Sequence, residues 1–218
     1  MYEKDSFYLL LTFYINGNTA DKDYSYSYIE LGINQTDEIG YQGELSLNLP
    51  SLPIYLKGLI KDEKVESNNS SYDKTGTTLA IGVHTSLSDI FNGVSMRGLT
   101  FDFEKILELY AEIGFNKWEL EDESTIAEDG TDAYARAGLK IGNASAWEYD
   151  LFVEKTKLAE VALDPITNKN KYTFSDQTNN NIGIKIINHL GESASYSLGY
   201  NNDDFSGSSF SLGFRYNF

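Results

Sequence analysis

The feature that most constrains the fold of this chain is an alternation of apolar and polar residues that recurs in ten segments. In residues 209–218 every second side chain, from Phe210 to Phe218, is apolar, and the side chains between them are small, polar or charged. Each segment is close to the ~9–11 residues that a β-strand needs to cross a membrane. The other nine segments lie at about 24–34, 41–49, 52–62, 77–87, 107–115, 132–142, 146–158, 181–189 and 193–202.

Composition excludes several classes of protein. The chain has 218 residues, only 3 prolines and no low-complexity block, which indicates a single compact domain. It has no cysteine, so disulfides and thiolate metal sites are excluded. A net charge of −16 argues against nucleic acid as a partner. The longest apolar run, "FYLLLTFYI" at 7–15, is about half the ~20 residues of a transmembrane helix.

Connections between the segments alternate in length. Residues 50–53, 142–145 and 189–193 are short, whereas 62–76, 119–132 and 164–178 are long and polar. Short turns at one end and long loops at the other are typical of outer-membrane barrels. The exception is 88–105, a long connection on the short side, which we interpret as a structured periplasmic turn.

These patterns predict an all-β fold, an antiparallel up-and-down transmembrane β-barrel of about ten strands, with twelve or eight strands as alternatives. Residues 21–218 form the single barrel domain in this interpretation. A soluble sandwich or lipocalin-like barrel also alternates its faces. In such folds the charged face meets water, however, and charges need not match between strands.

The polar faces of the ten segments carry charges whose sign largely alternates from strand to strand. Buried charges persist when they are paired, and opposite charges across neighbouring strands are favourable. We therefore expect a charge network that fills the lumen, and closing 207–218 against 24–34 places Arg215 beside the strand of Glu30, with Glu44 as a second partner. The predicted network consists of Glu30, Glu44, Lys57, Lys61, Glu108, Glu112, Arg136, Lys140, Glu148, Asp150, Glu154, Lys185 and Arg215.

The C-terminus carries a specific motif. Ser211, Gly213, Tyr216 and Phe218 fit the pattern polar–x–Gly–x–x–aromatic–x–aromatic on an alternating strand. This pattern resembles the β-signal of bacterial outer-membrane proteins, which the barrel-assembly machinery recognises. The resemblance implies a bacterial outer membrane as location, outer-membrane lipid and lipopolysaccharide as surroundings, and the assembly machinery as partner. The stretch "LSLNLPSLP" at 45–53 is also faintly similar to a strand and turn of the YfaZ-type family.

Residues 1–20 allow two interpretations. Lys4, a short apolar core and Ala20 are typical of a signal peptide, whereas Glu3 and Asp5 are unusual in its first part. We therefore assign 1–20 as a signal peptide or an accessory N-terminal segment. In the alternative, residues 6–15 form an eleventh strand, which the expectation of an even strand number disfavours.

Catalytic residues are scarce. His84 and Ser86 share a strand face, and outer-membrane lipid A deacylases use a His-x-Ser pair, but here both residues face the lumen and the sequence identifies no orienting acid. We predict no enzyme, no catalytic residue, no metal and no cofactor. The predicted function is a structural or surface-interaction barrel with a closed lumen; the alternatives are a narrow channel for small solutes or ions and, less favoured, a lipid-modifying enzyme.

The segment 119–132 is acidic and contains no basic residue. Its carboxylates are candidate ligands for divalent cations that bridge to lipopolysaccharide phosphates, because hard cations prefer oxygen ligands. The simpler interpretation is a solvated loop that is kept extended by the repulsion of like charges.

Overall fold

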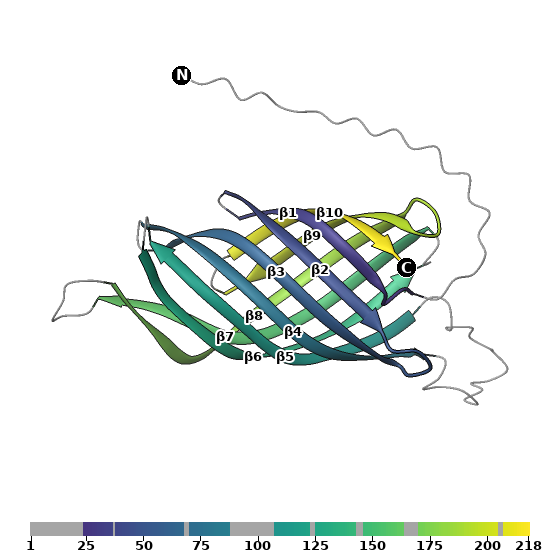
Figure 1. The fold of residues 1–218 in the computed structure, drawn as a ribbon, viewed down its shortest axis with the longest axis horizontal. Helices are drawn as coiled ribbons and strands as arrows, with labels where there is room; N and C mark the ends of the chain where they lie inside the picture. Colours follow the sequence, from purple (N-terminus) through teal and green to yellow (C-terminus); the bar gives the residue numbers. More distant parts are fainter. Residues whose placement is uncertain are drawn as a thin grey trace, which may run out of the picture.

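A computed structural model of the chain shows a closed barrel of ten antiparallel strands (Figure 1). The structure describes residues 24–36, 38–67, 70–87, 107–122, 125–142, 146–163, 170–204 and 207–218. The strands are β1 (Tyr28–Gln35), β2 (Ile39–Asn48), β3 (Ile54–Ser67), β4 (Ser70–Ser86), β5 (Leu107–Asp122), β6 (Thr125–Gly142), β7 (Trp147–Leu163), β8 (Asn170–His189), β9 (Ala194–Asp203) and β10 (Gly207–Asn217).

Each strand pairs with its neighbour in sequence, and the barrel closes where β1 pairs with β10. At this seam eight consecutive residue pairs match in register, from Tyr28 opposite Asn217 to Gln35 opposite Phe210. The prediction of a ten-stranded up-and-down barrel is confirmed. Because the sheet is closed, it leaves no unpaired edge strand, which is the condition for β-structure in hydrocarbon.

The wall of the barrel has two heights. Strands β1, β2, β9 and β10 contain 8 to 11 residues, whereas β3 to β8 contain 14 to 20. We call the first group the short wall and the second group the tall wall. Figure 1 shows the paired ends of β7 and β8 reaching away from the barrel body, at the end opposite the C-terminus.

The tall wall corrects the prediction of three long loops. Most of 62–76, 119–132 and 164–178 is β-ladder, which continues to the pairs Ser67–Ser70, Asp122–Thr125 and Leu163–Asn170. Backbone hydrogen bonds keep these strands paired after the apolar alternation has ended. The amino-acid pattern therefore marked where the apolar faces end, and not where the strands end.

The two faces of the wall differ in the way that a membrane barrel requires. On β1, for example, Ile29, Leu31 and Ile33 are 41–64% exposed on the outside, whereas Glu30 is 1% exposed on the inside. Apolar side chains therefore form an outer belt, and charged and aromatic side chains fill the lumen. This is the reverse of a soluble sandwich or lipocalin-like barrel, whose apolar face points inward.

Inside the barrel, three aromatic rings each lie over a glycine of the next strand. A Cβ atom added to Gly82 would come within 2.2 Å of the ring of Tyr55. The corresponding distances are 2.4 Å for Gly138 under the ring of Tyr110, and 2.3 Å for Gly183 under that of Phe152. These three glycines thus provide the space into which the bulky rings pack.

Two predictions fall on residues that the structure does not describe. The turn expected at 88–105 and the signal peptide or accessory segment expected at 1–20 both lie outside the described residues. Within the part of the chain that the structure describes, no helix is long and apolar enough to cross a membrane.

Candidate functional site

The lumen of the barrel is the candidate site, and its charges meet across the barrel as well as along the wall. At the seam, the guanidinium of Arg215 on β10 donates from Nε and NH2 to Glu30 Oε2 on β1, each at 2.8 Å. The ammonium of Lys185 on β8 donates to Glu30 Oε1 at 3.0 Å. Since β8 and β1 are not neighbours, this second contact crosses the lumen. The carboxylate of Glu30 is therefore paired with two cations.

A second group of ion pairs centres on Glu112 of β5. Lys57 Nζ on β3 lies 3.3 Å from Glu112 Oε1 and 3.5 Å from Glu44 Oε1. The hydroxyls of Tyr55 and Tyr134 donate to the two oxygens of Glu112, each at 2.8 Å. The carboxylate is thereby neutralised and hydrogen-bonded on both oxygens, which is what makes a buried charge tolerable.

The third group surrounds Arg136 on β6. Its NH2 lies 3.4 Å from Asp150 Oδ2, and its NH1 lies 3.7 Å from Glu154 Oε2. Arg136 Nε donates to the hydroxyl of Tyr110 at 3.1 Å, and that hydroxyl donates to Asp150 Oδ1 at 2.7 Å. The guanidinium also lies over the ring of Phe152, 3.6 Å from its centroid. The guanidinium of Arg136 thus contacts side chains of β5 and β7 and occupies the lumen between them.

A fourth group lies toward the periplasmic end. Lys140 Nζ lies 2.8 Å from Glu148 Oε1, and His189 Nε2 lies 3.3 Å from Glu148 Oε2. His189 Nδ1 is 2.9 Å from the hydroxyl oxygen of Ser195, which accepts from the amide of Asn217 at 3.1 Å. The order hydroxyl, imidazole, carboxylate is that of a nucleophile, base and orienting acid, but Ser195 is completely buried. The cluster is thus a closed hydrogen-bond network joining β7, β8, β9 and β10.

Residues 24–27, which precede β1, turn into the periplasmic end of the lumen. The hydroxyl of Tyr24 donates to the carbonyl of Gly142 on β6 at 2.8 Å. The ring of Tyr26 stacks on His84, with 4.1 Å between the ring centroids, and packs against Tyr55 at 4.6 Å. We call this segment the N-terminal plug. The alternating pattern from 24 to 34 gave no signal that its first residues leave the wall.

His84 is held between this plug and an acid. Its Nδ1 pairs with a carboxylate oxygen of Glu108 on β5. Sequence reasoning found no acid beside His84, because the register of β4 against β5 cannot be read from one strand. That register places His84 opposite Tyr110 and Ser86 opposite Glu108, so that the imidazole reaches the acid diagonally. The ring stacked on Tyr26 serves packing, and it does not face the outer belt where a lipid substrate would lie.

Very little space remains within these groups. Between the Glu30, Glu112 and Arg136 groups and Tyr26, the cavity measures only about 10 Å³, about the volume that one water molecule requires. Toward the extracellular end, a cavity of about 90 Å³ lies between Lys61, Glu154 and Asn201. Among the described residues, the space between these side chains is thus much smaller toward the periplasmic end of the lumen than toward the extracellular end.

The structure places all thirteen residues of the predicted network on the inward face. Seven are acidic and six are basic, so their charges nearly cancel. Lys61 lies at the extracellular end and pairs with Glu63, which the prediction did not include. The predicted network did not include the tyrosines that hydrogen-bond the carboxylates: the alternation places Tyr110 on the same face as Glu108 and Glu112, but it does not show which residue of another strand its hydroxyl reaches.

The four residues of the C-terminal motif divide between the faces. Tyr216 and Phe218 are exposed on the outer belt, whereas Gly213 faces inward and Ser211 lines the 90 Å³ cavity. A Cβ atom on Gly213 would lie 2.7 Å from Glu30 Oε1, so this glycine leaves room for the carboxylate at the seam.

The acidic segment 119–132 is a hairpin and not a free loop. Within the described part of the chain, Glu119 pairs with Lys117 at 2.6 Å, and Asp132 accepts from the indole of Trp118 at 2.9 Å. Among the described residues, no group of three or more acidic or histidine side chains is placed to hold a metal ion.

In comparisons with known proteins, this chain is similar to solved structures only. No family model matches the chain, and no curated protein matches it. A KdgM porin solved in complex with disordered oligogalacturonate has a TM-score of 0.49 and 7% sequence identity, and the match covers 88% of this chain and 99% of that one. A NanC porin has a TM-score of 0.42 and 9% identity, over 88% and 98% of the two chains. The translocator domain of the autotransporter NalP from Neisseria meningitidis has a TM-score of 0.37 and 10% identity, over 88% and 86%. Because these TM-scores are below 0.5, the function proposed below rests on the geometry of this chain alone.

Proposed function

We propose that this chain is an integral β-barrel of a bacterial outer membrane whose lumen is closed, and that it serves a structural or surface-interaction role. The observation that carries the proposal is the cavity of about 10 Å³ among matched charges at the centre of the lumen. A conducting pore needs a continuous water path. Here the ion pairs of the Glu30, Glu112 and Arg136 groups occupy the section that such a path would cross.

The N-terminal plug supports the same proposal from the periplasmic end. Tyr26 packs on Tyr55 and His84, and the ammonium of Lys140 lies 4.6 Å from the centre of the Tyr26 ring. The lumen is thus closed by two layers, one from strand side chains and one from residues that precede β1. A barrel with this interior is suited to stiffen the membrane and to hold the hairpins of the tall wall outside it.

Planar-bilayer conductance tests the closed lumen. The unmodified protein is expected to give no steady single-channel steps, and Tyr26→Ala is expected to give none, because the ion-pair layer remains. A double variant, Tyr26→Ala with Arg136→Ala, removes a member of each layer and is expected to produce conductance. Steady steps from the unmodified protein would establish the alternative, a narrow channel for small solutes or ions that enter from the 90 Å³ cavity.

Assembly by the barrel-assembly machinery is the second part of the proposal. The exposed aromatic rings of Tyr216 and Phe218 lie on the strand that closes the barrel, where a recognition signal is accessible until closure. Deleting Phe218, or Tyr216→Ala, is expected to slow insertion when the machinery is present, as measured by heat-modifiable migration on a gel. An unchanged folding yield in both variants would contradict this role. The faint similarity to the YfaZ-type family adds nothing to this proposal.

We also propose that 119–132 binds lipopolysaccharide through divalent cations, supported by the carboxylates of Glu119, which is partly exposed, and Glu121, which is exposed. We propose no catalytic role. His84 is stacked on the plug, and the hydroxyl of Ser195 is buried. Loss of a lipid-modifying activity in His84→Ala or Ser86→Ala would contradict this assignment.

A further inference from the structure

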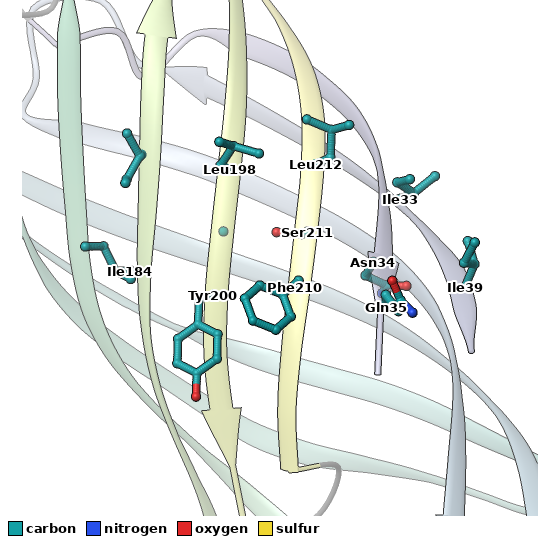
Figure 2. Close-up of a pocket in the computed structure, with 12 residues that line it drawn as sticks. Ile33, Asn34, Gln35, Ile39, Ile184, Leu198, Tyr200, Phe210, Ser211 and Leu212 are labelled. Carbon is teal, nitrogen blue, oxygen red and sulfur yellow. The ribbon is translucent and has the colours of Figure 1, made fainter. Parts of the chain in front are cut away.

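The outer face of the short wall contains a groove of about 430 Å³ that crosses β8, β9, β10, β1 and β2 (Figure 2). Two cross-strand rows of side chains form its sides. Leu198, Leu212 and Ile33 stand opposite one another in the row nearer the periplasm. Tyr200 and Phe210 stand opposite one another in the row nearer the exterior, which continues through Gln35 to Ile39. The two rows run across the strands, and so does the groove.

The floor of the groove is backbone. Gly199 and Ser211 are opposite each other between the two rows, and their side-chain positions face the lumen. Figure 2 shows Ser211 at the level between Leu212 and Phe210, with the side chain of Leu212 on one side of it and that of Phe210 on the other. At Gly199 and Ser211 the outer surface is therefore main chain, which lies between the two rows of larger side chains.

Polar groups lie directly beyond the outer side of the groove. The hydroxyls of Tyr200 and Ser208 are 3.1 Å apart, and Ser208 Oγ donates to Asn202 Oδ1 at 3.0 Å. All three residues are exposed on the outer face. In Figure 2 the ring of Tyr200 extends away from Leu198, so that its hydroxyl lies toward the end of β9. Along the strands, an apolar groove is thus followed by a hydrogen-bonding rim, as at a membrane–water interface.

We propose that this groove binds one acyl chain of a membrane lipid, whose ester or hydroxyl groups meet the Tyr200–Ser208–Asn202 rim. The inference rests on the proposed membrane location. The groove is continuous with the apolar belt, so hydrocarbon is what surrounds it. An acyl chain in the groove makes van der Waals contact on two sides and beneath, whereas a convex part of the belt contacts it on one side only. The site is thus distinguished from the rest of the belt by shape and by its polar rim.

Photolabelling tests the site directly. The purified protein is reconstituted in phosphatidylcholine vesicles that contain a small fraction of the same lipid with a diazirine on one acyl chain, and labelled peptides are mapped after irradiation. We expect labelling of the peptides with Leu198, Leu212 and Ile33 to exceed severalfold that of other belt peptides. Even labelling around the belt would overturn the site. Crosslinks between two copies at these residues, in place of lipid, would assign the groove to a dimer and also overturn it.

Two variants and a matched control sharpen the test. Phe210→Ala removes one side of the groove, and Ile33→Phe fills it; both are expected to reduce labelling of the groove severalfold. The control is Phe115→Ala on β5, because Phe115 and Phe210 are 66% and 63% exposed on the outer belt. It is expected to leave groove labelling unchanged. Heat-modifiable migration verifies folding of each variant. Unchanged labelling in both folded groove variants would contradict the proposal.

Failure of the site and failure of the proposed function give different results. A barrel that is not embedded in the membrane would show no labelling on any outward-facing peptide, and a conducting barrel would show single-channel steps. An embedded, closed barrel without this site would show uniform labelling and no steps.

Discussion

The short wall and the tall wall of the barrel are stabilised by different means. On the short wall the strands end where their apolar faces end, and the β1–β10 seam is joined by buried ion pairs at Glu30. On the tall wall the same kind of ladder continues for several further residue pairs without an apolar belt. The comparison teaches that buried charge and apolar surface fix the part inside the membrane, whereas backbone pairing extends the hairpins beyond it with local side-chain contacts such as Trp118–Asp132.

The largest expected effect is at the seam. Glu30→Ala removes the partner of both Arg215 and Lys185, and removing one member of a buried ion pair typically costs ~3–5 kcal/mol. Arg215→Ala should cost less, because Lys185 still neutralises Glu30. Urea unfolding in lipid vesicles measures both.

The double variant Glu30→Ala with Arg215→Ala checks the assignment. It is expected to be less destabilised than the sum of the single variants, since the two residues share one interaction. Additive effects below about 1 kcal/mol would mean that these side chains face water.

The next largest loss of stability is expected where an aromatic ring packs over a glycine inside the barrel. Gly82→Ala places a Cβ atom 2.2 Å from the ring of Tyr55 and should cost ~1–3 kcal/mol by overpacking. The matched control is Gly58→Ala on the neighbouring strand, where the nearest atom, Leu79 Cδ2, would lie at 3.7 Å. Equal unfolding free energies for the two variants would show that the ring of Tyr55 moves away without cost.

A smaller effect is expected on the tall wall. Replacing residues 65–72 by a two-residue turn removes only ladder that lies beyond the apolar belt. Because such segments tolerate truncation, the free energy of unfolding should change by less than about 1 kcal/mol. A loss comparable with that of Glu30→Ala would mean that the extended hairpins are part of the cooperative unit, and the distinction between the walls would fail.

The smallest effect lies where the short wall meets the tall wall. The pKa of Asp204, in the turn after β9, is lowered by hydrogen bonds from the side-chain amide and then the backbone N–H of Asn180 on β8. Because the folded pKa lies below the unfolded value of ~3.9, this contact stabilises the turn above that pH. The contribution is lost as pH falls through the folded pKa.

Amide hydrogen exchange at Asn180 is the measurement, since its N–H is 3.0 Å from Asp204 Oδ2. Exchange should be faster in Asp204→Ala than in the unmodified protein at neutral pH, with no change in the global unfolding free energy. Identical exchange in the two proteins would show that the turn is not held to β8.

Sequence reasoning predicted the strands, their faces and the closure, because apolar alternation at a period of two follows directly from the geometry of a strand. It also placed Arg215 beside Glu30, since a closed barrel must bring its first and last strands together. It could not predict the register, and with it the Glu108 partner of His84. The extended hairpins and the inward turn of Tyr24 and Tyr26 were missed for a related reason: main-chain pairing and contacts with residues of distant strands leave no periodic signal.

The two cations at Glu30 have a consequence for how the barrel forms. Lys185 and Arg215 lie more than 150 positions after Glu30 in the chain, on β8 and β10. Until those strands arrive, the carboxylate on β1 has no counter-ion from them and is unsuited to hydrocarbon. The step that joins β1 to β10 brings Arg215, the second of these two cations, to Glu30, so a barrel left open at the seam lacks this ion pair and the closed ring is favoured. A copy truncated before β10 would keep Lys185 but lose Arg215, and its Glu30 carboxylate would be left with one of its two cations.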